Sequence, residues 1–393
     1  MIVRGYIKCS TCDYPHMPRV QVGIEPSQIH AFNCLNCNEP IKLSLNAKNG
    51  PFKVSLVPLE NCEEIGETEC TPVYLCADFT AHPEQINERL SFPSMNLHHQ
   101  VFNSPKVFEM MERAASSEAP THKIFDDWLA IEKIWRLEKS DKHIIAKPLI
   151  SKFAKEHERQ DSNLSEILWS FLNSVFPLKA ELRLELKSII QINPSEFRTF
   201  LKFYKKELKQ HHRRSQFDIM SGYFKAYDQH SQLMIYIRLG TPLSNIGKAT
   251  LVEFDKVRSF YASAYEFFAG AIAIYTCLNN IKEGRTYDQL KNITLKKYLE
   301  TDKAKRRESI LTNSVFASAT VEFDSIIRNG SFHNWFFLQS DNETIEIRSG
   351  GTGALKQITY TEYLYHCGMM FKQFCQLFIL ELELEKIINE YGL

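Results

Sequence analysis

The chain has 393 residues, of which 44% are apolar and 24% charged, and its 47 basic and 47 acidic side chains cancel. This length favours two or three domains over one, and this composition excludes a largely disordered chain. A formally neutral chain has no overall attraction for nucleic acid, so such an affinity requires a local basic patch.

The start of the chain and its cysteines predict a cytoplasmic protein. The first residues carry no apolar secretory segment, and the most apolar run, 267–278, is too short to span a bilayer. Ten cysteines, four of them in two CxxC pairs, are typical of thiolates in a reducing compartment rather than of a disulfide scaffold. We therefore expect no membrane contact.

Residues 1–100 predict a β-rich domain. Short β-type runs at 20–22, 41–45 and 54–57 are separated by proline, glycine and asparagine, which favour turns. The strand signals end near residue 100, where we place the first domain boundary.

Two CxxC pairs in this domain predict a metal site. Cys9 and Cys12 are followed, after 21 residues, by Cys34 and Cys37. Four thiolates at this spacing complete a tetrahedral shell, so the expected ion is a structural Zn²⁺; four independent thiols are the alternative. Residues 4–45 resemble a zinc ribbon, a module that commonly docks nucleic acid or another protein. Three further cysteines have irregular spacing and are interpreted as ordinary thiols: Cys62, Cys70 and Cys76.

Residues 101–250 predict a helical, basic middle domain. This stretch carries 24 basic and 18 acidic side chains, and its pattern has helical periodicity. A helix start is expected at 193–196, with breaks at 176–177 and 240–242.

The run 202–214 is the strongest basic feature of the middle domain. It holds six Lys or Arg together with the rings of Phe203 and Tyr204, a composition that grips a phosphate backbone without reading bases. A solvated helix C-terminus, where basic residues offset the helix dipole, is the alternative. The candidate RNA-binding residues are Lys205, Lys206, Lys209, Arg213 and Arg214.

Residues 251–393 predict a helical bundle with a β-hairpin insertion. Apolar positions at alternating spacings of three and four predict one long helix over 254–278, a second helix over 316–327 that leads into 328–333, and a third from Tyr363 to Leu377. Between the last two helices, 341–348 and 355–360 flank a glycine-rich turn and predict the hairpin.

The sequence Arg328-Asn329-xxx-His333 at a helix end, with its neighbouring helices and hairpin, resembles the HEPN domain over about residues 250–390. The RxxxxH motif of that family marks metal-independent ribonucleases. The chain departs from the commoner motif by placing Gly330 and Ser331 inside it, which predicts a weakened helix there.

The resemblance implies an endoribonuclease that uses no catalytic metal. RNA supplies its own 2′-hydroxyl nucleophile, so cleavage needs a base of near-neutral pKa and a fixed cation for the phosphate, for which His333 and Arg328 are the candidates. Asn329 shares a helical face with His333 and would orient the site, whereas Arg328 lies about 140° from His333 on an ideal helix. The family implies a homodimer, in which Arg328 could complete the site across the two-fold axis.

Other roles for these residues stay open. By resemblance, Glu266 in the preceding helix would orient the site; a solvent-facing carboxylate is its alternative. Alternatively, His333 is a histidine packed in the protein interior, and Arg328 forms a surface ion pair with Asp324.

The sequence thus predicts a mainly α protein with an N-terminal β-rich zinc-ribbon domain (1–100), a basic helical middle (101–250) and a HEPN-like helical domain (251–393). The expected activity is RNA cleavage that leaves 2′,3′-cyclic phosphate and 5′-hydroxyl ends. By analogy with the family, the role would be that of a toxin or antiviral defence effector with a protein trigger or regulator. The alternative function is a non-catalytic sensor or scaffold that binds nucleic acid or protein.

Overall fold

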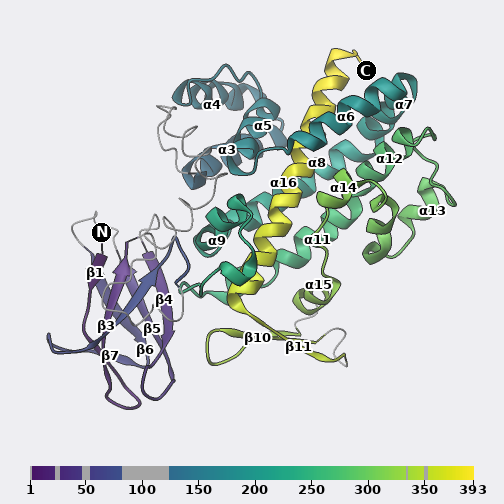
Figure 1. The fold of residues 1–393 in the computed structure, drawn as a ribbon. Helices are drawn as coiled ribbons and strands as arrows, with labels where there is room; N and C mark the ends of the chain where they lie inside the picture. The colour runs from purple at the N-terminus through teal and green to yellow at the C-terminus, as the bar shows by residue number, and fades with distance from the viewer. Residues whose placement is uncertain (1, 23–26, 47–53, 82–123, 333–334, 349–352) are drawn as a thin grey trace. The chain divides into compact units, whose positions relative to one another are not determined.

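The computed structural model describes residues 2–22, 27–46, 54–81, 124–332, 335–348 and 353–393 (Figure 1). Their contacts group the chain into two units. The first unit comprises Met1–Pro120, Ala226–Ser259 and Ile326–Gly368, and the second comprises Thr121–Lys225, Phe260–Ser325 and Met369–Leu393. The expected boundary near residue 100 lies outside the described residues, and the division into three consecutive domains stays a prediction.

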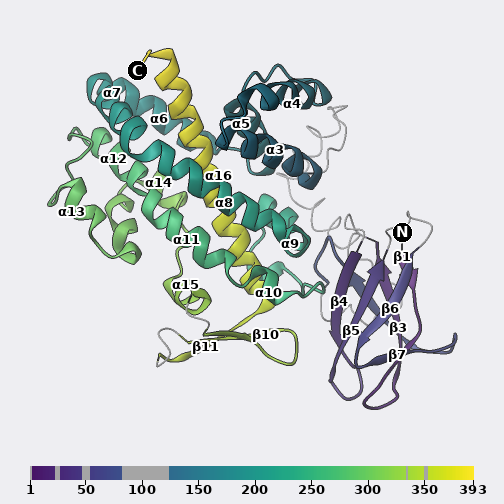
Figure 2. The ribbon, with the colours of Figure 1, turned by 180° about the vertical axis from the view of Figure 1, so that it is seen from behind.

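The first unit begins with two β-sheets, which confirm the predicted β-rich region (Figure 2). In the five-stranded sheet, β3 pairs antiparallel with β1 and β2 and parallel with β8, while β7 pairs with β2. Its strands are β1 (Ile2–Arg4), β2 (Ile7–Cys9), β3 (Pro15–Gln21), β7 (Cys62–Glu64) and β8 (Thr71–Cys76). The second sheet is the antiparallel meander β4 (Ser27–Asn33), β5 (Pro40–Asn46) and β6 (Ser55–Glu60).

Alternating residues of both sheets bury their side chains in one shared core, which includes Val20, Ile41, Leu43 and Val73. Strands outside 4–45 are therefore part of the same fold as the two CxxC pairs. The zinc-ribbon resemblance of that shorter stretch stays a prediction.

The rest of the first unit holds the candidate motif. It consists of helices α9 (Tyr227–Leu239), α10 (Phe254–Val257) and α15 (Ser325–Phe332), the short 3₁₀ turn η3 (Leu243–Asn245), and the first part of α16 (Tyr360–Glu390). The predicted hairpin is confirmed as β10 (Thr344–Arg348) and β11 (Leu355–Thr359), with β9 (Phe336–Leu338) as a third antiparallel strand. Of the expected turn glycines, 350–351 lie outside the described residues.

The second unit is helical. Its first segment contains α3 (Ile124–Lys139), α4 (His143–Glu156), α5 (Leu164–Val175), α6 (Ala180–Ile192), α7 (Pro194–Phe203), the short π-helix η2 (Tyr204–Leu208) and α8 (Lys209–Lys225). Its second segment contains α11 (Phe260–Ala271), α12 (Ala273–Lys282), α13 (Leu295–Leu299), the 3₁₀ helix η4 (Lys303–Ile310) and α14 (Ser314–Ser318). The remainder of α16 is its third segment. The predicted start of α7 is confirmed, since the Asn193 side chain accepts from the N–H of Glu196 and Pro194 occupies the first turn.

The prediction of one long helix over 254–278 is wrong. The chain forms α10, α11 and α12 in succession, with a turn at Arg258 and Ser259. At that turn the carbonyls of Val257 and Arg258 accept hydrogen bonds from the hydroxyl of Tyr363, at 3.0 and 2.9 Å. These carbonyls therefore bond a side chain instead of continuing the helix.

The prediction of one helix over 316–327 is also wrong. Helices α14 and α15 are separated by an irregular segment, 319–324. In this segment the N–H and carbonyl of Glu322 bond the side-chain amide of Gln373, at 2.6 and 2.9 Å, and the N–H of Asp324 donates to the hydroxyl of Tyr261. Side chains distant in sequence thus replace the helical hydrogen bonds of this segment.

Two buried histidines of the first unit predict acid lability. Burial lowers the pKa of His30 and of His230 from 6.5 to about 3, so both rings stay neutral in the folded protein. The unfolded chain takes up these protons below about pH 6.5, so stability should fall as pH falls from 6.5 toward 3, by about 1.4 kcal/mol per pH unit for each ring. Urea titrations at several pH values measure this slope.

In the same titrations, His30→Gln should flatten the slope by about half of that effect, because it removes one of the two buried rings. If the stability of the wild type and of His30→Gln depended on pH equally, the lowered pKa of His30 would be contradicted.

Candidate functional site

The two CxxC pairs occupy equivalent turns, one between β2 and β3 and one between β4 and β5. In each turn, the residue four positions after the first cysteine has a left-handed backbone: Asp13 with φ of 55° and Asn38 with φ of 62°. Their N–H groups donate to the carbonyls of Cys9 and Cys34, both at 2.9 Å. Asp and Asn tolerate this conformation better than most residues, so the local sequence itself favours these turns.

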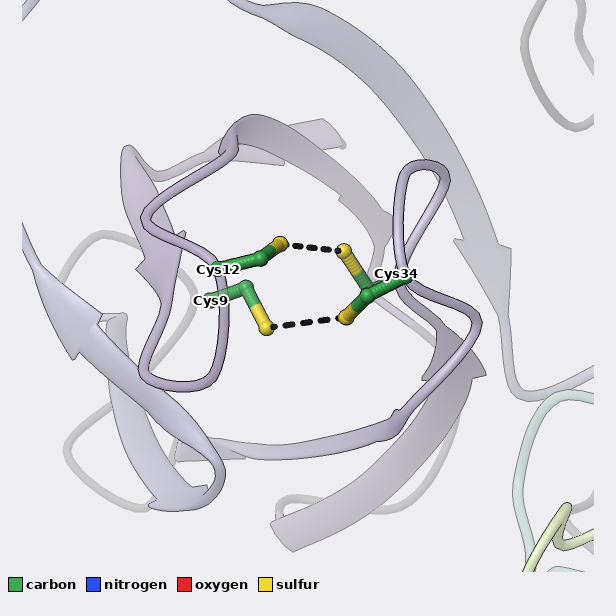
Figure 3. A group of neighbouring side chains, drawn as sticks. Cys9, Cys12 and Cys34 are labelled. Atoms are coloured by element: carbon green, nitrogen blue, oxygen red, sulfur yellow. Dashed lines mark hydrogen bonds between the residues drawn. The ribbon is translucent and has the colours of Figure 1, made fainter.

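The turns bring four sulfur atoms together (Figure 3). The Sγ atoms of Cys9, Cys12, Cys34 and Cys37 all lie within 4.8 Å of one another. Cys12 and Cys34 are 3.6 Å apart, and Cys9 and Cys37 are 3.8 Å apart. Sulfur atoms at the corners of a tetrahedron with bonds of about 2.3 Å are separated by about 3.8 Å. The cluster therefore has the dimensions of a four-thiolate metal site.

The four thiols differ in environment. Cys9 and Cys34 are buried, whereas Cys12 and Cys37 are half-buried. The side chain of Asn36, helped by the backbone of Tyr14, lowers the pKa of Cys12 to about 6, while burial raises the pKa of Cys34. These contacts favour the thiolate form of Cys12, and a bound cation would favour loss of the proton from Cys34.

Two residues that support the cluster were not predicted from the sequence. Nε2 of the buried His16 lies 3.3 Å from Sγ of Cys34, and burial lowers the pKa of His16 to about 4. A neutral ring protonated on Nε2 can donate to a thiolate. Asn61 accepts from Thr11 of the first turn and donates to the carbonyl of Pro40 after the second, at 2.8 and 3.0 Å.

Cys62, Cys70 and Cys76 are not part of this cluster, which is the one group of possible metal ligands found among the described residues. The thiol of Cys62 donates to the carbonyl of Lys42 at 3.3 Å, and burial raises the pKa of Cys76 to about 12. Both are protonated at neutral pH, as expected of ordinary thiols.

Loss of one buried sulfur should abolish metal binding. Cys34→Ser leaves three thiols and removes the partner of His16, so we expect purified protein to lose its bound metal and the first unit to unfold more readily. Elemental analysis of the wild type and the variant measures this. Cys70→Ser is the matched control because Cys70 lies outside the cluster, and a wild type without bound metal would exclude the site.

The RxxxxH motif lies at the end of α15. This helix runs through Gly330 and Ser331 to Phe332, so the expected weakening at these residues does not interrupt it. Arg328 and Asn329 are half-buried, Nη1 of Arg328 donates to Oδ1 of Asn329 at 2.6 Å, and its guanidinium lies 5.7 Å from the ring centre of Phe332. His333 follows directly but lies outside the described residues.

The glycine and serine of the motif hold α15 in place. The hydroxyl of Ser331 donates to the carbonyl of Arg258. A Cβ atom on Gly330 would come within 2.5 Å of Cγ2 of Ile347 in β10, so only glycine lets the helix approach the hairpin this closely. The departure from the commoner motif thus has a packing reason.

Glu266 belongs to the second unit, and it is not the solvent-facing carboxylate that was its alternative. Its side chain is half-buried and accepts from Nζ of Lys303 at 2.6 Å. An orienting role in the site stays a prediction.

Gly330→Ala should destabilise the first unit. The added methyl group would collide with a β-branched side chain, and overpacking of this kind costs about 1–3 kcal/mol. Gly66→Ala is the matched control, because a Cβ there meets nothing within 4 Å. Chemical denaturation compares the two, and equal stability would show that the helix and hairpin are not closely packed.

The basic run 202–214 lies inside a continuous helical stretch from α7 through η2 to α8, which ends at Lys225. A helix C-terminus is therefore the wrong explanation for its charge. Tyr204 is buried, and its hydroxyl donates to Glu381, so it is no stacking surface.

The five candidate RNA-binding residues of this run differ in their partners. Lys209 and Arg213 pair with the buried Glu385, at 3.5 and 2.5 Å. Lys206 pairs with Glu207, and Nζ of Lys205 donates to the carbonyl of Leu393. Arg214 is exposed and has no ion pair among the described residues. Their contact with RNA stays a prediction.

Comparisons of the chain with models of protein families, with curated proteins and with solved structures give no match. Among the described residues, none of the helices combines the length and hydropathy needed to cross a membrane. The function therefore has to be argued from the site itself.

Proposed function

We propose that the chain is a metal-independent endoribonuclease of the HEPN type. The observation that supports this proposal is the hydrogen bond between Arg328 and Asn329 near the end of α15, with His333 next in the sequence after the last described residue of that helix. A fixed cation beside a polar group and a histidine is the set of groups that RNA self-cleavage requires.

The chemistry balances without a cofactor. His333 takes the proton of the 2′-hydroxyl, the 2′ oxygen bonds to phosphorus, and the bond from phosphorus to the 5′ oxygen breaks. The leaving oxygen takes a proton from water while His333 returns its proton to the solvent, which gives a 2′,3′-cyclic phosphate and a 5′-hydroxyl. Arg328 stabilises the charge that develops on the phosphate oxygens, and Asn329 orients the site.

We infer that the ion of the four-cysteine cluster is a structural Zn²⁺. Four sulfur ligands that lie within 4.8 Å of one another favour zinc, and a closed shell leaves no position for a substrate. Its role is to hold the two turns of the β-rich region together.

Removal of either candidate catalytic group should abolish cleavage without unfolding the protein. His333→Ala and Arg328→Ala should each lower the rate of RNA cleavage by about 10²- to 10⁴-fold, since proton transfer and charge stabilisation supply effects of this size. A fluorogenic RNA assay measures the rate, and circular dichroism checks folding. Arg348→Ala, on the exposed end of β10, is the matched control and should cleave normally.

A mixture of the two inactive variants distinguishes a site shared across a homodimer from a self-contained one. Recovered activity indicates that Arg328 of one protomer serves His333 of the other. Cleavage that survives both substitutions would contradict the proposed site, and wild-type protein that binds RNA but never cuts it would favour the sensor or scaffold function.

A further inference from the structure

The second unit contains a large cleft that no sequence motif indicated. It has a volume of about 1290 Å³ and is lined by α3, α5, the region of η2 and α8, and α16. This exceeds the roughly 300–1,000 Å³ of common small-molecule pockets, so the cleft has room for an extended ligand. Residues from four separate segments of the chain meet here.

Six Lys or Arg and six Asp or Glu side chains line the cleft. Among the lining residues, the buried Glu385 accepts from Ser165 at 3.3 Å and pairs with both Lys209 and Arg213. The one negative charge of Glu385 is thus opposed by two positive charges, so these three side chains together carry a net positive charge.

The other carboxylates also have partners. Glu383 accepts from the indole N–H of Trp169 at 2.9 Å and lies 3.6 Å from Arg183. Glu166 accepts from the N–H and hydroxyl of Ser162 at the start of α5. Asp161 lies 4.0 Å from Nη1 of Arg159. Glu138 and Asp141 lie 2.8 and 3.7 Å from nitrogen atoms of His143. The carboxylates of the cleft thus have partners within the protein, but those with neutral donors keep their charge.

Two cations of the cleft remain available for a ligand. Arg214 of α8 and Lys386 of α16 are exposed, and neither has an ion pair among the described residues. Lys139, also exposed, lies over the ring of Phe217 at 4.9 Å. Available positive charge at the edge of a cleft complements the phosphates of an anionic chain.

Trp169 adds a surface for stacking. It is 36% exposed, and the bond from its indole N–H to Glu383 fixes the orientation of the ring. Bases of a single strand stack on such rings, whereas the bases of a duplex are covered by their neighbours.

We propose that this cleft binds single-stranded RNA, with phosphates at Arg214 and Lys386 and a base stacked on Trp169. The identity of the ligand rests on the proposed ribonuclease function, but the binding site itself is separate from the RxxxxH motif. The cleft would hold one part of a substrate strand, and the RxxxxH motif would cut another part of the same strand.

The test measures RNA binding by the full chain carrying His333→Ala, so that binding is separated from cleavage. Fluorescence anisotropy follows a labelled 12-nucleotide single strand, the same strand in a duplex, and a labelled mononucleotide. The added variants are Trp169→Leu and the double variant Arg214→Gln/Lys386→Gln. Lys147→Gln/Lys187→Gln is the matched control, with the same loss of charge from exposed positions outside the cleft and outside the basic run.

We expect the single strand to bind more tightly than the duplex or the mononucleotide. Trp169→Leu should weaken single-strand binding roughly tenfold, and the double variant should reduce the slope of log K against log salt by about 1.4, while the control leaves both unchanged. Circular dichroism and gel filtration check that each variant keeps its fold and oligomeric state.

An equal loss in the control, or duplex or mononucleotide binding as tight as that of the single strand, would overturn the proposal. Unchanged binding by both cleft variants, with the wild type still cutting RNA, would refute the cleft alone. Binding that depends on the cleft in a protein that never cuts RNA would refute the proposed activity alone.

Discussion

The backbone carbonyl of Arg258 accepts hydrogen bonds from two side-chain hydroxyls, and the candidate catalytic motif depends on this junction. Ser331 donates to it from α15, and Tyr363 donates to it from α16 at 2.9 Å. Both donors are buried, and a buried hydroxyl without a partner is costly. The two bonds therefore fix α15 relative to the start of α16, and Gly330 lets β10 close on the same helix. The position of Arg328, one turn earlier, follows from that anchoring.

Elements with local signals could be predicted from the sequence, and elements fixed by distant partners could not. Residues 363–377 of α16, the hairpin of β10 and β11, and the start of α7 at Asn193 follow from periodicity and capping within a few residues. The rest of α16 extends beyond the predicted helix. The breaks in the two other predicted helices depend on Tyr363 and Gln373, which are 106 and 51 residues from their partners. Apolar spacing carries no information about such bonds.

The candidate sites divide in the same way. Spacing alone identified the four cysteines that the structure brings together, because each CxxC turn is a local structure. His16 and Asn61, which support them, come from strand and turn positions without a distinctive pattern. The cleft of the second unit combines four segments; the basic run around Arg214 supplies one of them, but its composition does not indicate a cleft. Charge composition predicted a binding surface but not the carboxylates that occupy part of it.

The most direct test of the proposed ribonuclease is the chemistry of the RNA ends that it forms. Purified protein is incubated with a defined RNA in the presence of EDTA, and the products are mapped by end-specific ligation and mass spectrometry. Attack by the 2′-hydroxyl predicts a 2′,3′-cyclic phosphate and a 5′-hydroxyl at each cut, formed without added metal. Products with a 5′-phosphate, which arise when water attacks the phosphorus, would contradict the proposal, and so would the absence of any cleavage.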